Sequence, residues 1–414
     1  MPPPLAPERT GLHRDRMTLA FYGPFVVWGW LLYSFNPSVP LLADELGISA
    51  AQAGLHGTAM AVGAIVASFV TPMLVRAQGR RGAIVVASVA VVVGAAAIVA
   101  APSLPWSLAA MAVLSWGGNV SISSAQAGLA VRHGSKASAA LTEGNGVGSS
   151  VGLLGPLAVG ACVALGWGWR PAVAVTALLA LATAVAVWRI PVGGAMTPPH
   201  AVTPPAPARG AARAGSRVPA WCFVATLVAA VSMEFATTYW ATGLVIEQTG
   251  AGPGIAAATT AGLVAGMSAI RFVVGPLSLR VAPATLLAAA FVVAIGGWAI
   301  LWSATTPWVA MVGLVVAGLG YGAQYPLSIA LLLATAPGRA DAMQARATLV
   351  GGLAIGVAPF ALGALSDAAG THQAFLVVPV VAIVGAVAAF LGGRSLRLRL
   401  EPAVPLEPGV AADR

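Results

Sequence analysis

Glu234 lies near the middle of a long apolar segment, about 15 residues from the start of a stretch that begins near residue 219. A carboxyl group that is removed from water favours its protonated form. Glu234 could therefore take up a proton near neutral pH and release it when its surroundings change. The structural alternative is a protonated side chain that the hydroxyl group of a neighbour holds in place. Because an ionisable group inside an apolar segment is costly, we treat Glu234 as the first functional candidate.

The composition indicates that these apolar segments lie in lipid. The chain has 414 residues, of which 58% are hydrophobic and only 8% are charged, whereas a soluble domain carries about 25% charged residues. The net charge of +9 does not indicate nucleic-acid binding, because the basic residues lie between the apolar segments. We therefore expect an integral membrane protein that is surrounded by the lipid bilayer.

The sequence contains no pattern that favours a cofactor or a metal ion. Cys162 and Cys222 both lie in apolar segments, which argues against a disulfide framework or a thiolate metal site. No cluster of His, Cys and Asp has the spacing of metal ligands. The chain has one lysine and no Gly-x-x-x-x-Gly-Lys-Ser/Thr loop, so an ATP-driven pump is disfavoured. We expect no cofactor.

The apolar segments predict twelve membrane-spanning helices, since a span needs roughly 20 apolar residues. The expected spans are 17–41, 51–75, 82–101, 105–131, 137–165 and 170–190, followed by 219–246, 254–279, 283–304, 307–336, 344–366 and 373–392. The Pro-rich segment between the two sets predicts a flexible linker. The resulting organisation is a tail (1–16), a six-helix bundle (17–190), a linker (191–217), a second six-helix bundle (218–392) and a second tail (393–414).

The basic residues predict the orientation. Nearly all of them lie before the first span or after an even-numbered one, as with Arg14, Arg80, Arg132, Arg189, Arg280 and Arg394. The exceptions are Arg170, in an opposite loop, and Arg271, within a span. Basic loops stay on the cytoplasmic side. We therefore expect a multi-pass protein of the cytoplasmic membrane with both termini in the cytoplasm.

The two predicted bundles carry an internal repeat. Gly155-Pro156-Leu157-Ala158-Val159-Gly160-Ala161 recurs as Ala358-Pro359-Phe360-Ala361-Leu362-Gly363-Ala364 at an offset of 203 residues. A second pair, around Pro72 and Pro276, has an offset of 204. Two parallel membrane repeats with a site between them are typical of a secondary transporter.

The loop after the second span resembles the signature Gly-x-Leu-x-Asp-x-x-Gly-Arg-Arg of the major facilitator superfamily. Leu74, Gly79, Arg80 and Arg81 match, while Pro72 replaces the Gly and Arg76 replaces the Asp. The resemblance covers about residues 17–392. It implies an all-α protein of twelve transmembrane helices in two six-helix bundles related by a pseudo-two-fold axis. It also implies a monomeric transporter that is not an enzyme and that works by alternating access.

The resemblance implies that spans 1, 4, 7 and 10 line a central cavity. Trp28, Trp30, Asn119 and Tyr321 then reach a depth similar to that of Glu234, and the aromatic residues could form a wall for an amphipathic solute. The candidates for binding solute or protons are Glu234, Trp28, Trp30, Asn36, Asn119, Trp240, Tyr321 and Gln324. Most of the polar members could instead form interhelical hydrogen bonds.

Four charged residues are candidates for the interface and gate. The resemblance implies that spans 5 and 8 pack together, and Glu143 and Arg271 each lie about two turns from the cytoplasmic end of these spans. Since either charge alone in lipid is costly, we expect them to form an ion pair, either as a static clasp or as a gate. Arg80 and Arg81 are expected to clamp the cytoplasmic face.

Two transport functions and one other class remain open. The first is proton-coupled export of small amphipathic compounds, which the Gly155-Pro156 segment favours because it partly resembles the family's antiporter motif. The second is import of an organic metabolite by proton symport, because no basic residue occurs at 82–131, where many proton antiporters carry an arginine. The third is a membrane receptor or enzyme without transport, for which no polar catalytic cluster is present.

Overall fold

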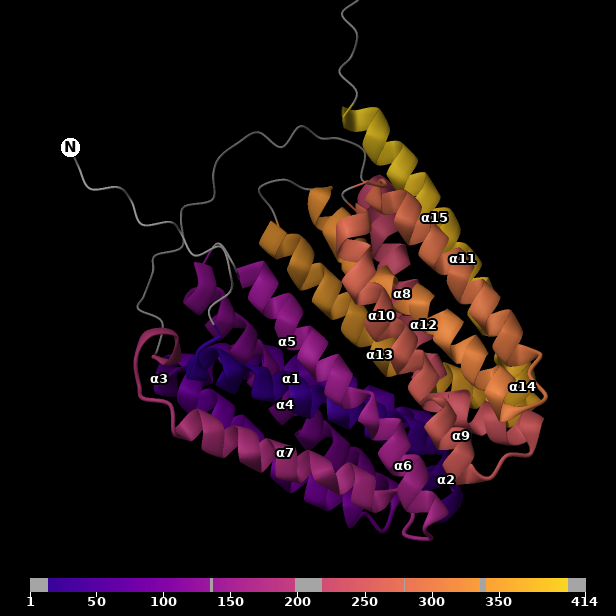
Figure 1. Ribbon diagram of the computed structural model, residues 1–414, viewed down its shortest axis with the longest axis horizontal. Helices are drawn as coiled ribbons and strands as arrows, with labels where there is room; N and C mark the ends of the chain where they lie inside the picture. The colour runs from indigo at the N-terminus through magenta and orange to yellow at the C-terminus, as the bar shows by residue number, and fades with distance from the viewer. Residues whose placement is uncertain (1–13, 135–136, 198–217, 279, 336–339, 401–414) are drawn as a thin grey trace, which may run out of the picture.

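The computed structural model describes residues 14–134, 137–197, 218–278, 280–335 and 340–400. Within these ranges every regular element is a helix. Figure 1 shows the first half of the chain, in indigo to magenta, beside the second half, in rose through orange to yellow, with α2, α6, α9 and α14 gathered at one end. The fold class predicted from the sequence is confirmed: the protein is an all-α membrane protein.

The first half contains six passes through the bundle. The first pass is α1 (Arg16–Phe35), which continues through the short helix η1 (Asn36–Ser38) into α2 (Val39–Leu46). The other helices are α3 (Ala50–Val99), α4 (Leu104–His133), α5 (Ala137–Gly152), α6 (Leu154–Ala164), α7 (Arg170–Trp188) and the short η3 (Gly194–Met196). α5 and α6 together make one pass.

α3 makes two of these passes, which are joined at a sharp kink. A straight helix of 50 residues would be about 75 Å long, more than twice the thickness of the hydrocarbon core. Gly79 interrupts it with φ 71° and ψ 175°, a conformation that favours glycine. Gly63 before this point and Gly94 after it both touch α4, near Ser115 and Leu114, so the chain folds back at Gly79. The predicted loop after the second span is therefore helical on both sides of this glycine.

The second half repeats the pattern. Its helices are α8 (Val218–Thr249), α9 (Pro253–Thr259), α10 (Ala261–Ser278), α11 (Pro283–Trp302), α12 (Pro307–Ala334), α13 (Ala340–Ala369), α14 (Thr371–Ala374) and α15 (Val377–Leu400). Within the described ranges ten helices are long and apolar enough to cross a membrane. With α3 counted twice, and with the less apolar α4 included, the chain makes the twelve passes that the sequence predicts.

The helix directions define two ends of the bundle. We call the end at which α1, α5, α8, α11 and α13 begin the basic end, because Arg14, Arg80, Arg81 and Arg132 lie there. The opposite end carries the helix connections near Asp44, Glu45, Glu247 and Asp367. Part of the predicted linker packs at the basic end, where Ala195 and Met196 are buried. Residues 198–217, which make up most of the predicted linker, lie outside the described part of the chain.

Glycine contacts near the opposite end reveal the symmetry between the halves. A Cβ atom on Gly160 would lie 2.6 Å from the carbonyl oxygen of Gly254, and one on Gly363 would lie 2.4 Å from that of Ala50. Gly160 and Gly363 are 203 positions apart, while Ala50 and Gly254 are 204 apart. The contact of α6 with α9 is thus repeated as the contact of α13 with α3, as a pseudo-two-fold axis along the helix direction requires.

Candidate solute-binding site between the two halves

Polar side chains follow one face of the middle of α8. Glu234, Thr237 and Thr238 are three and four positions apart, so they are neighbours on the helix surface. The two threonines are buried and Glu234 is half-buried. Of the residues that the structure describes, none donates a hydrogen bond to the carboxylate of Glu234, which leaves it open to a ligand or a proton.

The two threonines connect α8 to helices on both sides. The hydroxyl groups of Thr237 and Tyr321 are hydrogen-bonded at 3.0 Å, which joins α8 to α12. Nδ2 of Asn36 donates to the hydroxyl of Thr238 at 3.1 Å, which joins the first half to the second. These bonds hold the segment that carries Glu234 against both partners.

Arg271 on α10 supplies the opposite charge near Glu234. Its Nη1 donates to the hydroxyl of Ser149 on α5 at 2.6 Å, so it also bridges the two halves. Its charge interacts with Glu234 and with the Tyr33 hydroxyl on α1. Nevertheless, the ion pairs within 4.0 Å among the described residues do not include Arg271 with Glu234. The two charges therefore interact electrostatically without forming an ion pair.

The packing of α12 explains why Glu234 and Arg271 lie at one level. Gly322 on α12 lies against Met267 and Ile270 of α10, while its neighbour Tyr321 bonds to Thr237 of α8. Glu234 precedes Thr237 on a helix that leaves the basic end, and Arg271 follows Ile270 on a helix that returns to it. Both charged residues therefore lie on the side of Tyr321 that faces the basic end.

Some of the other predicted site residues use their polar atoms in packing. Nε1 of Trp30 donates to the carbonyl of Ala172 at 2.9 Å, and Nε1 of Trp240 donates to that of Pro359 at 2.8 Å. Buried Gln324 donates to the carbonyl of Ala290 at 3.3 Å. These contacts tie helices together, so a solute would meet these three residues chiefly through their apolar surface.

Trp28 and Asn119, which belong to the first half of the chain, remain available for contact with a solute. Trp28 is half-buried, and its ring lies against Gly118 on α4. Asn119 is also half-buried and donates to the carbonyl of Ser115 on its own helix at 2.9 Å. Ser123 follows one turn later and is exposed, so a polar stripe runs along α4. A solute-binding role for Trp28 and Asn119 stays a prediction.

The sequence reasoning did not select Tyr33, Ser149, Thr237 or Thr238 for this site. Thr237 and Thr238 could have been found from their spacing to Glu234, since all three share one helix face. Ser149 lies in the glycine-rich stretch of α5 that includes Gly148 and Gly152, where a small polar residue gives no distinct signal. Tyr33 lies on the same helix as Trp28 and Trp30, and only the packing of α1 shows which of them faces Arg271.

The expected ion pair between Glu143 and Arg271 is not the arrangement in the structure. Glu143 pairs with Arg14 instead, with 2.6 Å between Arg14 Nε and Glu143 Oε1. Glu143 precedes Ser149, the partner of Arg271, by six residues on α5, which corresponds to about 9 Å along the helix and about 120° around it. Arg271 does not pair with Glu143 because Arg271 lies deeper in the bundle.

A second ion pair lies beside this one at the basic end. Asp15 caps α1 by accepting from the backbone nitrogen of Thr18 at 2.9 Å, and Arg132 of α4 donates to the same carboxylate at 2.5 Å. Burial alone would raise the pKa of Asp15, but the hydrogen bonds from Thr18 and Arg132 outweigh it and lower the pKa to about 2. Asp15 is therefore charged in this structure over the whole physiological range.

The predicted clamp residues Arg80 and Arg81 hold the fold-back of α3 against the end of the first half. Arg80 is buried and donates to the carbonyl of Ala195 at 3.0 Å. Arg81 donates to the carbonyl of Trp188 and lies over its ring, 4.6 Å from the centroid. Both contacts stay within the first half. Whether these arginines also act as a gate stays a prediction.

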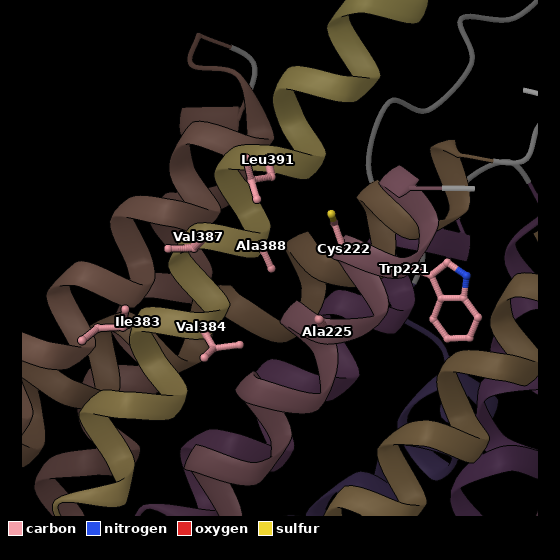
Figure 2. Close-up of a pocket in the computed structure, with 8 residues that line it drawn as sticks. All are labelled: Trp221, Cys222, Ala225, Ile383, Val384, Val387, Ala388 and Leu391. Carbon is pink, nitrogen blue, oxygen red and sulfur yellow. The ribbon is translucent and has the colours of Figure 1, made fainter. Parts of the chain in front are cut away.

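An apolar groove lies between the start of α8 and α15. It has a volume of about 460 Å³ and is lined by Trp221, Cys222, Ala225, Ile383, Val384, Val387, Ala388 and Leu391. Figure 2 shows that these side chains are apolar apart from the Trp221 nitrogen and the Cys222 sulfur. The groove has no charged residue in its lining, and we do not count it as part of the site.

Comparisons with known proteins identify the family. The sequence profile described as Major Facilitator Superfamily matches residues 25–295 and 222–409. The chain therefore belongs to the Major Facilitator Superfamily, whose members transport small molecules across membranes. A comparison with curated protein sequences gives no match.

Solved structures share this fold. One is a bacterial homologue of the human lysosomal transporter Spinster in an inward-facing, unoccupied conformation, with 16% identity over 94% of this chain and 99% of that chain and a TM-score of 0.76. A D-xylose–proton symporter has 12% identity over 91% and 96% of the two chains, with a TM-score of 0.74. The nucleoside transporter NupG has 11% identity over 92% and 98%, with a TM-score of 0.71. At such identities the likeness shows the fold alone.

Proposed function

We propose that this protein is a proton-coupled secondary transporter that exports a small amphipathic organic compound by alternating access. The observation that carries the proposal is the half-buried carboxylate of Glu234, which lies about one turn from the Asn36–Thr238 bond between the halves and has no hydrogen-bonding partner among the described residues. Such a group can bind either a proton or the positive charge of a solute, but not both. If the proton and the solute compete for Glu234, binding of one requires release of the other. The proton and the solute then cross the membrane in opposite directions.

The contacts between the halves support alternating access. They run from the opposite end, where Asp367 binds the start of α3, to the middle of the bundle, where Arg271 binds Ser149. Thr58 lies between these levels and donates to the carbonyl of Gly356 at 2.6 Å. We infer that these contacts close the site toward the opposite end. We assign the basic end to the cytoplasm because basic loops stay inside, so this state would load or release solute on the cytoplasmic side.

Import by proton symport is the second candidate. It is favoured by the absence of a basic residue from residues 82–131, and a symporter for D-xylose shares the fold. In a symporter, protonation of Glu234 would have to favour solute binding rather than oppose it. The direction in which a pH gradient drives the solute therefore separates the two functions.

The experiment uses purified full-length protein in liposomes with an imposed pH gradient. The probes are radiolabelled alkyl amines, alkyl carboxylates and ω-amino acids of matched chain length. Because neutral amines and carboxylic acids cross a bilayer unaided, accumulation is counted only in excess of that in protein-free liposomes. We expect at least one probe to show such an excess on the acidic side and to lose it when a protonophore is added. An excess on the alkaline side would establish symport instead. If the gradient drives no probe in either direction, proton-coupled transport of such compounds is rejected.

The role of Glu234 is tested with Glu234→Gln in the same liposomes. The variant should lose gradient-driven accumulation while keeping the thermal stability of the parent protein. Asp44→Asn is the matched control, because it also removes a carboxylate but lies exposed near the opposite end. Undiminished gradient-driven flux in Glu234→Gln would remove this residue from the coupling mechanism.

A further inference from the structure

We propose that the transported solute is a zwitterion, with an ammonium group that binds Glu234 and a carboxylate that binds Arg271. The inference rests on the proposed transport function and narrows its substrate class. It is carried by two opposite charges that lie at a similar level of the bundle and form no ion pair with each other. The contacts of Arg271 support the carboxylate-binding part of this proposal, and those of Glu234 support the ammonium-binding part.

Arg271 forms the anion-binding half of the site. A guanidinium group has five N–H donors in a planar fork that matches a carboxylate. Nη1 of Arg271 binds Ser149, and its charge interacts with the Tyr33 hydroxyl. The fork therefore keeps further donors for a ligand, while Ser149 of the first half holds one of its nitrogens in position. Since Arg271 belongs to the second half, a carboxylate bound here would touch both halves.

Glu234 forms the cation-binding half. Its carboxylate accepts no hydrogen bond from a described residue, and Tyr321 and Tyr325 of α12 lie near enough for their hydroxyl groups to interact with its charge. Tyr325 is 44% exposed, so its ring is accessible to a ligand. An ammonium group beside a carboxylate and aromatic rings gains both Coulomb and cation–π attraction.

The separation of the two charges selects a ligand that carries both. Glu234 and Arg271 attract each other, yet no ion pair within 4.0 Å forms between them in the described structure. A solute with one charge would compensate one of these residues and leave the other without a partner, which is costly away from water. A zwitterion compensates both and adds no net charge. The cost of leaving one charge without a partner therefore disfavours the binding of singly charged competitors.

The test measures binding to purified full-length protein in detergent, without any pH gradient. The probes are ω-amino acids with 2 to 12 carbon atoms, together with the alkyl amine and the alkyl carboxylate of each length. We expect one range of chain lengths to bind best, and the matched amine and carboxylate to bind at least about tenfold more weakly. Equal affinity for the three compounds of one length, or no binding of any ω-amino acid, overturns the proposal.

Two variants test which residue binds the ammonium group of the probe and which binds its carboxylate. Glu234→Gln should weaken binding of the ω-amino acid to the level of the alkyl carboxylate, and Arg271→Gln should weaken it to the level of the alkyl amine. Arg170→Gln is the control, since this arginine pairs with Glu45 at the opposite end. Variants that lose binding of all three probes are checked for folding by thermal unfolding. A folded Arg271→Gln that retains the full affinity for the ω-amino acid contradicts the assignment.

The outcomes separate this inference from the transport proposal. Selective binding of ω-amino acids without gradient-driven flux would support the zwitterion site and reject proton coupling. Gradient-driven flux of alkyl amines or carboxylates, with no preference for zwitterions, would support the transport function and reject this site.

Discussion

Asn36 donates a hydrogen bond to Thr238 at 3.1 Å, and the two residues are 202 positions apart in the chain. The sequence repeat has an offset of 203 or 204 residues, so Asn36 and Thr238 occupy nearly equivalent places in the two halves. Residues that are related by a two-fold axis can touch only near that axis. This bond therefore marks where the pseudo-two-fold axis passes, and Glu234 lies about one turn away on α8.

Removal of the Asn36–Thr238 bond should weaken the contact between the halves. We expect Thr238→Val to lower the free energy of unfolding by about 1 kcal/mol, the usual contribution of one hydrogen bond, plus the cost of the unpaired Asn36 amide. Thr226→Val is the matched control, because the hydroxyl of Thr226 binds only a carbonyl of its own helix. Thermal unfolding of the single variants and of Asn36→Leu/Thr238→Val measures the coupling. Additive effects of the two substitutions would show that the bond does not couple the halves.

Asp367 should stabilise closure of the opposite end. Its two carboxylate oxygens accept the backbone N–H groups of Ala50 and Ala51 at 2.8 Å each, and a negative charge at a helix start is favourable. We expect Asp367→Asn to weaken this contact by about 1 kcal/mol and to populate states that are open there.

The measurement is the distance distribution between spin labels in Pro102→Cys/Thr305→Cys, which places one label near the opposite end of each half. The labels require a background in which Cys162 and Cys222 are replaced. Asp367→Asn should broaden the distribution toward longer distances. An unchanged distribution, with the variant still folded, would show that Asp367 does not control closure.

Gly160 and Gly363 should be equally intolerant of a side chain. A Cβ atom on either would meet a backbone oxygen at 2.6 Å or 2.4 Å, and backbone cannot move aside as a flexible side chain can. Gly160→Ala and Gly363→Ala should therefore each cost about 1–3 kcal/mol of the closed state and slow transport. Gly252→Ala is the control, since nothing lies within 4 Å of its added Cβ. Transport rates in liposomes decide the matter, and an effect of only one of the two variants would contradict the symmetric interface.

Asp15 should make stability depend on pH in the acid range. Its pKa is lowered to about 2 in the folded protein, so it binds a proton more weakly there than in the unfolded chain. The contribution of Asp15 to the free energy of unfolding is thus fully present above the ordinary Asp pKa of about 4. It is lost as the pH falls toward 2. Asp15→Asn should flatten this part of the profile and cost on the order of 1 kcal/mol at neutral pH, because Asn also caps a helix. Unfolding midpoints between pH 2 and 7 test it; parallel profiles for the parent and Asp15→Asn would exclude the assignment.

The sequence by itself determined the helices, their number of passes and their symmetry. These properties follow from hydropathy over roughly 20 residues and from a repeat that can be read directly. The isolation of Glu234 inside α8 was also evident, because depth along a span depends only on position in the sequence.

Tertiary structure alone decided which side chains meet. The depth of a residue along a span does not determine the direction of its side chain, because successive side chains are rotated by about 100° around the helix axis. Glu143 therefore binds Arg14 rather than Arg271, and Trp30 points to α7. The rotation and depth of each helix are set by close contacts such as Gly322 against Met267, which join residues far apart in the chain. For this reason Tyr33, Ser149 and Arg271 could be recognised as one group only after the halves were packed together.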